Sequence, residues 1–347
     1  MTLGLTKWTA LFLVAGMLLA PSLEIVGAAA AGSGAAFFRG KTVRLIVGYA
    51  PGGGYDSYAR MIAPHLQEKL GTTVIVVNEP GGGGFNALIN LMRQPGDGLN
   101  ILLLNGEAAV LSTLVNESAA GFDLRELTYL GRVSYENRTL VARKGTPFDN
   151  ISGFLKPAKP VFFGAGGRID SMGDPASILC DALSIPCKLV TGFQGAADAA
   201  LALERGEVDA IVTSESQTAH LIQSRPLVAV AILSPHKASL LPGVPSVFDL
   251  VKLSSAKSKW LHFRADVADF GRTLTVPSDT PADYVTVLEN AVAAVLTDAS
   301  LEAEGARTSR PIAYAAPVVC KRIVNDVLAE ADQKGRATIR KLLLNAY

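Results

Sequence analysis

The chain has 347 residues, of which 49% are hydrophobic, and a formal net charge of +1 at pH 7. This length allows one large or two ordinary domains with full hydrophobic cores. The near-neutral charge argues against a nucleic-acid-binding protein, which would carry a basic face. The four histidines are far apart in the sequence and none has the spacing of metal ligands, so we expect no metal site.

Residues 1–31 have the pattern of a secretory signal peptide. Lys7 precedes a short apolar stretch, residues 8–20, and an alanine-rich segment follows. The apolar stretch is shorter than the roughly 20 residues that span a bilayer, which favours cleavage over the alternative, an uncleaved anchor. We therefore expect cleavage between Gly27 and Gly32 and a soluble mature protein in the periplasm.

Export makes disulfides possible, and the chain has three cysteines. Cys180 and Cys187 flank a segment that is typical of a helix end turning into a strand. They form either a disulfide across this turn or two free thiols. Cys320 is then left over, and we expect it to be a buried apolar residue.

Short apolar runs alternate with segments of helical periodicity after residue 40. The predicted strands are 43–47, 73–77, 100–104, 160–164, 188–191, 209–213, 227–233 and 272–276. The predicted helices are 56–70, 85–92, 108–115, 171–183, 196–205, 214–223, 281–296, 317–331 and 334–344. The strands are runs of Val, Ile and Leu, typical of parallel sheets covered by helices on both faces. The sequence therefore predicts an α/β fold.

The alternation is interrupted twice, in residues 124–144 and again after Leu233, where Pro235, Pro242 and Pro245 follow. Two irregular crossings favour two lobes joined by two connections, with the N-terminal third returning near the C-terminus. The alternative is one continuous doubly wound sheet of eight strands.

Four glycine-rich loops follow predicted strands, at residues 48–56, 78–84, 164–171 and 192–195. Glycine lets the backbone approach a ligand closely, and the following helix directs its unpaired N–H groups at the loop. In open α/β sheets ligands bind beyond the carboxyl ends of the strands. Each loop alone could serve only tight packing, but their recurrence predicts an anion-binding cleft between lobes.

Nucleotide and catalytic motifs are weak. No phosphate-binding G-x-x-x-x-G-K-[ST] loop and no G-x-S-x-G nucleophile motif occurs, and Ser57 stands where a dinucleotide fingerprint requires its last glycine. Ser214, Ser216 and His220 share one predicted helix, where a base and a nucleophile would not meet at one reacting atom. We therefore expect no catalytic residues and no cofactor.

Five segments in order resemble the periplasmic substrate-binding proteins of tripartite tricarboxylate transporters, the TctC or Bug family. They are the strand 41–47 with the loop Pro51-Gly52-Gly53-Gly54-Tyr55-Asp56, the loop 78–84, the turn 95–102, the segment 195–210 and Leu241-Pro242-Gly243-Val244-Pro245-Ser246. The resemblance is close from Gly40 to Val247 and poor over 254–272.

The resemblance implies a two-lobed type II periplasmic-binding-protein fold, with a ligand cleft between lobes joined by two crossing segments. The lobes would be residues 37–130 with 256–347, and residues 131–255. It also implies a receptor that is not an enzyme, has no cofactor, binds a small organic carboxylate and delivers it to a transporter with one large and one small membrane subunit. The receptor would be a monomer without nucleic-acid partners. The alternative is an exported, hydrolase-like α/β enzyme acting on a small acidic substrate.

The resemblance also implies which residues bind the ligand. Asp56 would organise waters or a polar group, and Ser171 would lie where a helix start grips a carboxylate. The first lobe would contribute Tyr49, Pro51, Gly52, Gly53, Gly54, Asp56, Gly82, Gly83 and Gly84. The second would contribute Gly166, Gly167, Arg168, Ser171, Phe193, Gln194, Gly195 and Ser214. Departures from the family pattern at Gly48–Ala50, Phe85 and Ala165–Gly167 bear on which acid is bound.

Overall fold

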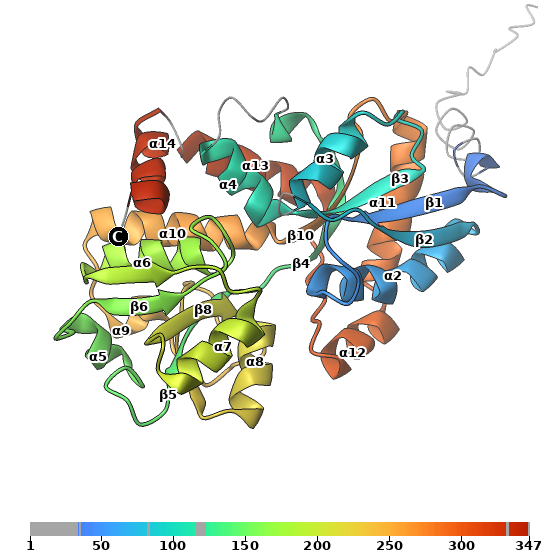
Figure 1. The fold of residues 1–347 in the computed structure, drawn as a ribbon. Helices are drawn as coiled ribbons and strands as arrows, with labels where there is room; N and C mark the ends of the chain where they lie inside the picture. Colours follow the sequence, from blue (N-terminus) through green and yellow to red (C-terminus); the bar gives the residue numbers. More distant parts are fainter. Residues whose placement is uncertain (1–33, 35, 82–83, 116–122, 331–332, 346–347) are drawn as a thin grey trace, which may run out of the picture.

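The computed structural model describes residues 34, 36–81, 84–115, 123–330 and 333–345. Two five-stranded sheets form the centres of two lobes (Figure 1). The strand order is β2-β1-β3-β10-β4 in the first sheet and β7-β6-β8-β5-β9 in the second. The strands are β1 (Thr42–Val47), β2 (Thr73–Asn78), β3 (Asn100–Asn105), β4 (Thr128–Ser134), β5 (Arg138–Arg143), β6 (Val161–Gly164), β7 (Cys187–Val190), β8 (Ala210–Ser214), β9 (Leu227–Ile232) and β10 (Arg272–Val276).

Each sheet is mixed, so the prediction of wholly parallel sheets was wrong. In the first sheet β1 is parallel to β2 and β3, whereas β10 is antiparallel to β3 and β4. In the second, β6 is parallel to β7 and β8, whereas β5 is antiparallel to β8 and β9. A continuous apolar run reports burial on both faces but not strand direction.

The chain crosses between the sheets twice. Residues 135–137 connect β4 of the first sheet to β5 of the second, and residues 233–271 lead from β9 back to β10. Two separate sheets exclude the single eight-stranded sheet. Strands β4 and β5 lie in the stretch that the sequence left irregular, because Gly131 and Arg132 interrupt the apolar run of β4. Strand β4 also continues to Ser134 in the first sheet, beyond the expected lobe boundary at residue 130.

Among the described residues all nine predicted helices are present, together with four that the sequence did not predict. The predicted ones are α2 (Gly54–Leu70), α3 (Phe85–Met92), α4 (Gly106–Val115), α6 (Gly173–Leu183), α7 (Ala196–Arg205), α8 (Glu215–Ser224), α11 (Ala282–Leu296), α13 (Pro317–Glu330) and α14 (Gln333–Arg340), which continues into a π-helical turn (Lys341–Asn345). The others are α5 (Ile151–Leu155), α9 (Val247–Leu250), α10 (Ser255–Phe270) and α12 (Ala299–Arg307).

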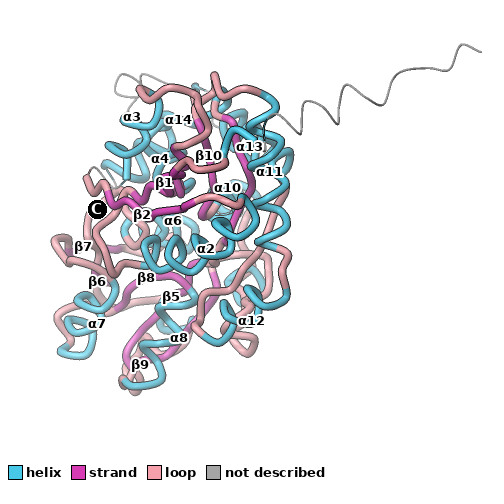
Figure 2. Tube along the Cα trace, turned by 90° about the vertical axis from the view of Figure 1, so that its right-hand side faces the viewer, coloured by secondary structure: helices cyan, strands magenta, loops and turns pink. Residues whose placement is uncertain are grey.

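Helices cover both faces of each sheet (Figures 1 and 2). In the first lobe α2 and α11 pack on one face, and α3, α4 and α13 on the other. Strand β3 shows why both faces are apolar: Leu102 and Leu104 pack with one helix layer, while Ile101 and Leu103 pack with the other. Successive side chains of a strand point to opposite faces, so a strand between two layers must be apolar throughout.

Helix α10 joins the two lobes. It packs against α6 of the second lobe and against α4 and α13 of the first. One apolar cluster runs continuously from Leu102 in the first sheet to Phe163 in the second, and α10 contributes Leu261, Phe263 and Val267 to it. The sequence did not predict this helix, and its fully buried face includes a charged residue, Arg264.

Cys180 and Cys187 form a disulfide that links the end of α6 to the start of β7, with their Cα atoms 6.2 Å apart. Of the two alternatives that the sequence left open, the structure has the bridge. Cys320 is buried in α13, as expected. Burial raises the pKa of the Cys320 thiol to about 11, so the thiol stays protonated.

Arg264 is 1% exposed and binds two carboxylates from the two lobes. Its Nη2 lies 2.7 Å from Oε2 of Glu107 on α4, and its Nε bonds to Asp174 at the start of α6. Burial disfavours ionisation of Asp174 and raises its pKa to about 6 in spite of Arg264. The guanidinium therefore compensates two buried carboxylates, one from each lobe.

We expect Arg264→Met to destabilise the protein by about 3 kcal/mol or more, because it leaves two buried carboxylates without their shared cation. Lys259→Met is the matched control, since Lys259 is exposed on the same helix, and it should stay within about 0.5 kcal/mol of the natural chain. Urea unfolding at pH 7 measures both. Equal effects of the two substitutions would contradict this role of Arg264.

Candidate ligand-binding site

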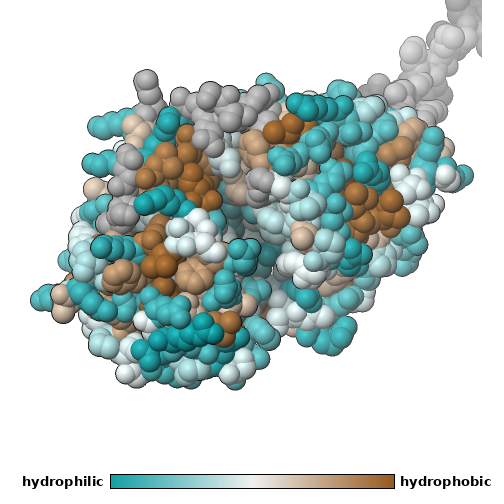
Figure 3. Space-filling view, viewed as in Figure 1, coloured by the Kyte–Doolittle hydropathy of each residue, from teal (hydrophilic) through white to brown (hydrophobic). Residues whose placement is uncertain are grey.

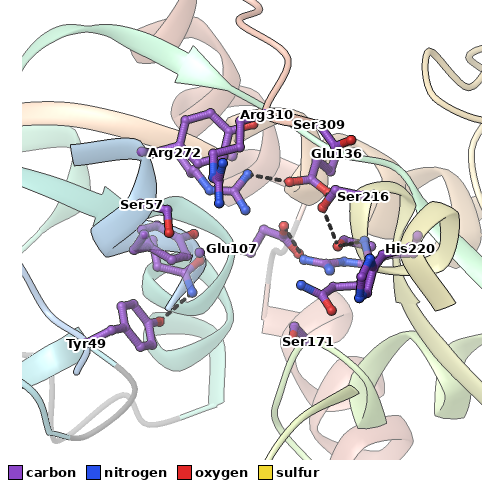
Figure 4. Close-up of a pocket in the computed structure, with 18 of the residues that line it drawn as sticks. Tyr49, Ser57, Glu107, Glu136, Ser171, Ser216, His220, Arg272, Ser309 and Arg310 are labelled. Atoms are coloured by element: carbon purple, nitrogen blue, oxygen red, sulfur yellow. Dashed lines mark hydrogen bonds and ion pairs between the residues drawn. The ribbon is translucent and has the colours of Figure 1, made fainter. Parts of the chain in front are cut away.

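A cavity of about 610 Å³ lies between the lobes and is lined from both sides. Tyr49 follows β1, Asn105 ends β3 and Ser214 ends β8, so the cavity lies at the carboxyl ends of parallel strands. Figure 4 shows Tyr49, Ser57 and Arg272 on one side and Ser171, Ser216 and His220 on the other. This is the position at which open α/β sheets bind ligands.

Two arginines reach the cavity because their strands are antiparallel to their neighbours. Arg138 is the first residue of β5, and Arg272 is the first residue of β10. The start of an antiparallel strand lies at the edge where the parallel strands end. Each sheet therefore contributes one guanidinium to the cavity wall, from a residue outside the glycine loops.

Aromatic rings hold Arg272 in place. Its Cζ lies 5.0 Å from the ring centre of Tyr55 and 4.4 Å from that of Tyr58. Tyr55 stacks on Tyr49 with ring centres 4.7 Å apart, and the Tyr49 hydroxyl accepts a hydrogen bond from Asn105 at 2.6 Å. Burial raises the pKa of Tyr49 and Tyr55 above 10, so these phenols are neutral at physiological pH. The rings offer their faces to the cation and confine its direction.

Glu136 connects the lobes at the cavity. Its Oε1 lies 2.9 Å from Nη1 of Arg272 in the first lobe. Its Oε2 accepts bonds from the hydroxyl and backbone N–H of Ser216, at 2.5 and 3.1 Å, in the second. Burial opposes ionisation of Glu136, but Arg272 and Ser216 outweigh it and hold the pKa below its usual range. Glu136 is therefore an ionised bridge between a strand of one lobe and a helix of the other.

Glu107 makes the second connection. Its Oε1 lies 2.5 Å from Nη2 of Arg138, and its Oε2 binds Arg264. Burial works against the ionised form, yet the charges of Arg138 and Arg264 hold the pKa of Glu107 below its usual range. Arg138 and Arg272 are thus each paired with a buried carboxylate, whereas Arg310, which also lines the cavity, donates to the Thr308 carbonyl at 3.2 Å.

The glycine loop of the second lobe folds back onto Asp170. The Asp170 carboxylate accepts hydrogen bonds from the N–H groups of Gly167, Met172 and Gly173, at 2.9, 3.0 and 2.5 Å. The loop before α7 does the same on a smaller scale, because Gln194 donates to Asp198 at 3.0 Å. The donors at the start of α6 are therefore satisfied by the chain itself.

The first glycine loop is braced by Asp56, which is 2% exposed. Its Oδ2 accepts hydrogen bonds from Gly52 N and Arg60 Nε, each at 2.9 Å, and its Oδ1 accepts from Asn78 Nδ2 at 3.0 Å. The bond from Arg60, helped by Gly52 and Asn78, lowers the pKa of Asp56 to about 2. This carboxylate fixes the loop against β2 and α2 and is not part of the cavity lining.

Five of the predicted binding residues line the cavity: Tyr49, Gly52, Gly54, Ser171 and Ser214. Gly82 and Gly83 lie outside the described residues. The others are not among its lining residues, and three of the four loops close on their own aspartates. These are Pro51, Gly53, Asp56, Gly84, Gly166, Gly167, Arg168, Phe193, Gln194 and Gly195.

The sequence reasoning missed the charged residues of the cavity. Glu107 is the second residue of α4, which begins directly after β3, and Arg138 and Arg272 are each the first residue of an apolar strand. A charge at the head of an apolar strand was a usable signal. This signal identifies a binding residue only when the strand direction is known, because the direction places the first residue of the strand at the cleft.

Ser216, considered above as a nucleophile, has its hydroxyl committed to Glu136 and lies 3.2 Å from the hydroxyl of Ser214. Within the described chain, no group of three or more His, Cys, Asp or Glu residues is placed to hold a metal ion. The site therefore offers charged and polar binding groups around an enclosed volume.

Asp56→Asn should destabilise the protein by about 1–2 kcal/mol at pH 7. This is less than the pKa shift of Asp56 alone would give, because solvent screens its ion pair with the exposed Arg60. The folded-state pKa of Asp56, about 2, lies below the unfolded value of about 3.9, so its contribution is complete above about pH 4 and is lost toward pH 2. Urea unfolding between pH 7 and pH 3 should show the gap to the natural chain narrowing as the pH falls. Glu68→Gln on the exposed side of α2 is the control, and a gap independent of pH would refute the prediction.

Comparison with known proteins agrees with this geometry. The model of the TctC family, the tripartite tricarboxylate transporter family receptors, matches residues 58–304. An Agrobacterium vitis protein, described as a UPF0065 protein in the TAR-I ttuE-ttuC' intergenic region, is 27% identical over 260 residues, which cover 74% of this chain and 71% of that protein.

Two solved structures share the fold. MatC from Rhodopseudomonas palustris, with bound malate, is 19% identical with a TM-score of 0.66, covering 87% of this chain and 98% of its own. A second R. palustris protein, solved with adipate, is 20% identical with a TM-score of 0.68, covering 86% and 97%.

None of the helices in the described ranges is both long and apolar enough to cross a membrane. The family model spans most of the chain, and the two-lobed architecture is that of the type II periplasmic binding proteins. The chain belongs to the tripartite tricarboxylate transporter receptor family, whose members are periplasmic solute receptors and not enzymes.

Proposed function

We propose that this receptor binds a small organic carboxylate in the interlobe cavity and delivers it to the one large and one small membrane subunit of a tripartite tricarboxylate-type transporter. The observation that carries the proposal is a cavity between two lobes with one guanidinium from each sheet, Arg138 and Arg272, in its wall. Malate and adipate, the molecules in the two solved structures, are both small carboxylates.

Ligand binding between the lobes explains how such a receptor would signal its loaded state. A ligand that contacts both walls stabilises the closed arrangement, which the membrane subunits then recognise. The moving bodies would be the two lobes expected from the sequence, residues 37–130 with 256–347 and residues 131–255, with the first boundary moved to the end of β4. They would turn about their two connections. Residues 1–31 would act as a signal peptide, and the mature protein would work in the periplasm as a monomer without a cofactor.

Some predicted ligand-binding residues lie outside the cavity lining, and we propose only that the loops that contain them take part in binding. The loop that contains Gly52 and Gly54 and the loop that contains Ser171 both border the cavity. Their outer residues, including Arg168 and Gln194, would reach a ligand only after further closure of the lobes.

We expect small carboxylates to raise the melting temperature of the purified protein by several degrees. At a concentration 100 times Kd, a ligand that binds only the folded state adds about 2.7 kcal/mol. A thermal-shift screen of mono-, di- and tricarboxylates measures this. The methyl ester of each active acid is the matched control and should have little effect, because it lacks the charge that the arginines attract.

The opposite outcome would favour the enzyme reading. If no carboxylate shifts the melting temperature while the protein hydrolyses ester or phosphate substrates, the receptor proposal is wrong for this chain.

A further inference from the structure

The anion-binding position at the start of α6 is already filled by the chain's own Asp170. Its carboxylate takes the N–H groups of Gly167, Met172 and Gly173. These are the donors that a ligand carboxylate at this helix start would need. A second carboxylate placed here would meet a like charge and would find these three N–H groups already bonded, which is unfavourable in a partly enclosed site.

Spare donors lie instead on Arg138 and Arg272, two of the three arginines that line the cavity. Arg138 uses only Nη2 and Arg272 only Nη1 in hydrogen bonds or ion pairs with the described residues. The Nε atom of each arginine is buried and has no hydrogen-bond partner among the described residues. A guanidinium carries five N–H donors, so after pairing with its glutamate each arginine retains N–H groups to which no described residue is hydrogen-bonded.

The surroundings of Arg272 direct those donors. The rings of Tyr55 and Tyr58 lie against the guanidinium, with its Cζ 5.0 and 4.4 Å from their centres. A guanidinium whose faces are covered by rings makes its hydrogen bonds through its edge. The edge already bonds to Glu136 and Ser134, and its remaining part is the position for a ligand carboxylate.

The charges of the lining balance before any ligand enters. The described lining residues include three arginines and three carboxylates: Arg138, Arg272, Arg310, Glu107, Glu136 and Asp170. A dicarboxylate would bring two negative charges into this balanced cavity. A monocarboxylate brings one, and hydrogen-bond donors at its other end would face the acceptor oxygens of Asp170.

These features point to a particular substrate class, on the assumption that the proposed receptor function is correct. We propose that the cavity selects a monocarboxylate whose far end carries a hydrogen-bond donor, a hydroxyl or an ammonium group, over a dicarboxylate of the same length. The carboxylate lies against Arg138 and Arg272. The donor end faces Asp170 and Ser171; Figure 4 shows Ser171 on the side of the cavity opposite Arg272.

The test compares acids of equal length. Butyrate, γ-hydroxybutyrate, γ-aminobutyrate and succinate form one set, and hexanoate, its terminal hydroxy and amino derivatives and adipate form a second. Isothermal titration and melting temperatures of the exported protein report binding. We expect a hydroxy or amino acid to bind about tenfold or more tightly than both the plain acid and the dicarboxylate of its set. The two derivatives distinguish a hydroxyl-bearing from an ammonium-bearing ligand.

Each other result decides against the inference. A dicarboxylate that binds as tightly as the derivatives overturns the substrate class and leaves the receptor function standing. A plain acid that binds equally well overturns the role of the donor end. If no carboxylate of the wider thermal-shift screen binds, the receptor function itself fails.

Asp170→Asn tests the residue that sets the preference. The amide keeps one oxygen to accept loop N–H groups but removes the charge, so we expect the preference over the dicarboxylate to fall about tenfold. Asp198→Asn is the matched control, because Asp198 also accepts a backbone N–H group of a neighbouring glycine loop, one instead of three, but lies outside the cavity lining. It should leave the preference unchanged, and equal preferences in all three proteins would refute the role of Asp170.

Arg272→Lys gives an independent test should Asp170→Asn fail to fold. Lysine keeps the charge but loses the planar edge between the two tyrosines, so every acid that binds should bind about tenfold more weakly. The melting temperature of the unliganded variant checks its folding. Unchanged binding in a folded Arg272→Lys variant would place the ligand carboxylate elsewhere.

Discussion

The pairing of buried arginines with buried carboxylates between the lobes is the interaction on which the rest of this structure depends. Glu107 forms ion pairs with Arg138 of the second lobe and with Arg264 of helix α10, while Glu136 forms one with Arg272. An isolated charge in such a position would greatly destabilise the folded state. Removing one member of a buried pair therefore destabilises the protein much more than replacing both members by apolar residues. The network therefore fixes which faces of the two lobes meet, and with them the shape of the cavity.

Apolar packing and the charged network contribute differently to the contact between the lobes. Figure 3 shows polar residues over much of the view, with apolar residues gathered in limited areas. The apolar cluster that runs through α10 holds the lobes together behind the cavity, and the charged network operates at the cavity itself. Apolar packing is non-directional, whereas a bond between a guanidinium and a carboxylate requires one geometry. The apolar cluster therefore holds the lobes together, and the charged network determines how they are aligned.

Much of the architecture could be predicted from the sequence because it rests on local signals. Runs such as Ile101–Leu104 report burial on both faces, and the loops after them report the turns into helices. Strand direction could not be predicted, because β5 and β10 look like any other buried strand until their partners in space are known. Helix α10 was not predicted, because its buried face contains the charged residue Arg264 and therefore lacks a continuous apolar pattern.

The same limit explains why the loops were found and the binding charges were not. The glycine loops have a sequence signature, and the structure places Gly52, Gly54 and Ser171 at the cavity. Arg138 and Arg272 owe their position to antiparallel strands, and Glu107 and Glu136 owe their ionisation to arginines far away in the chain. Such contacts have no local signature, because each depends on elements brought together only by the complete fold.

A receptor with charges already paired has consequences for how it holds a ligand. Two unpaired guanidinium groups in an enclosed cavity would destabilise the empty protein and would make release of an anion slow. Here Glu107 and Glu136 compensate the arginines in the absence of ligand, so less electrostatic energy is gained when an anion enters. The affinity must then come from hydrogen bonds to the spare N–H donors and to the acceptors across the cavity. Such bonds depend on the position of each donor and acceptor, so they favour the ligand whose groups match and add little for one that matches only in charge.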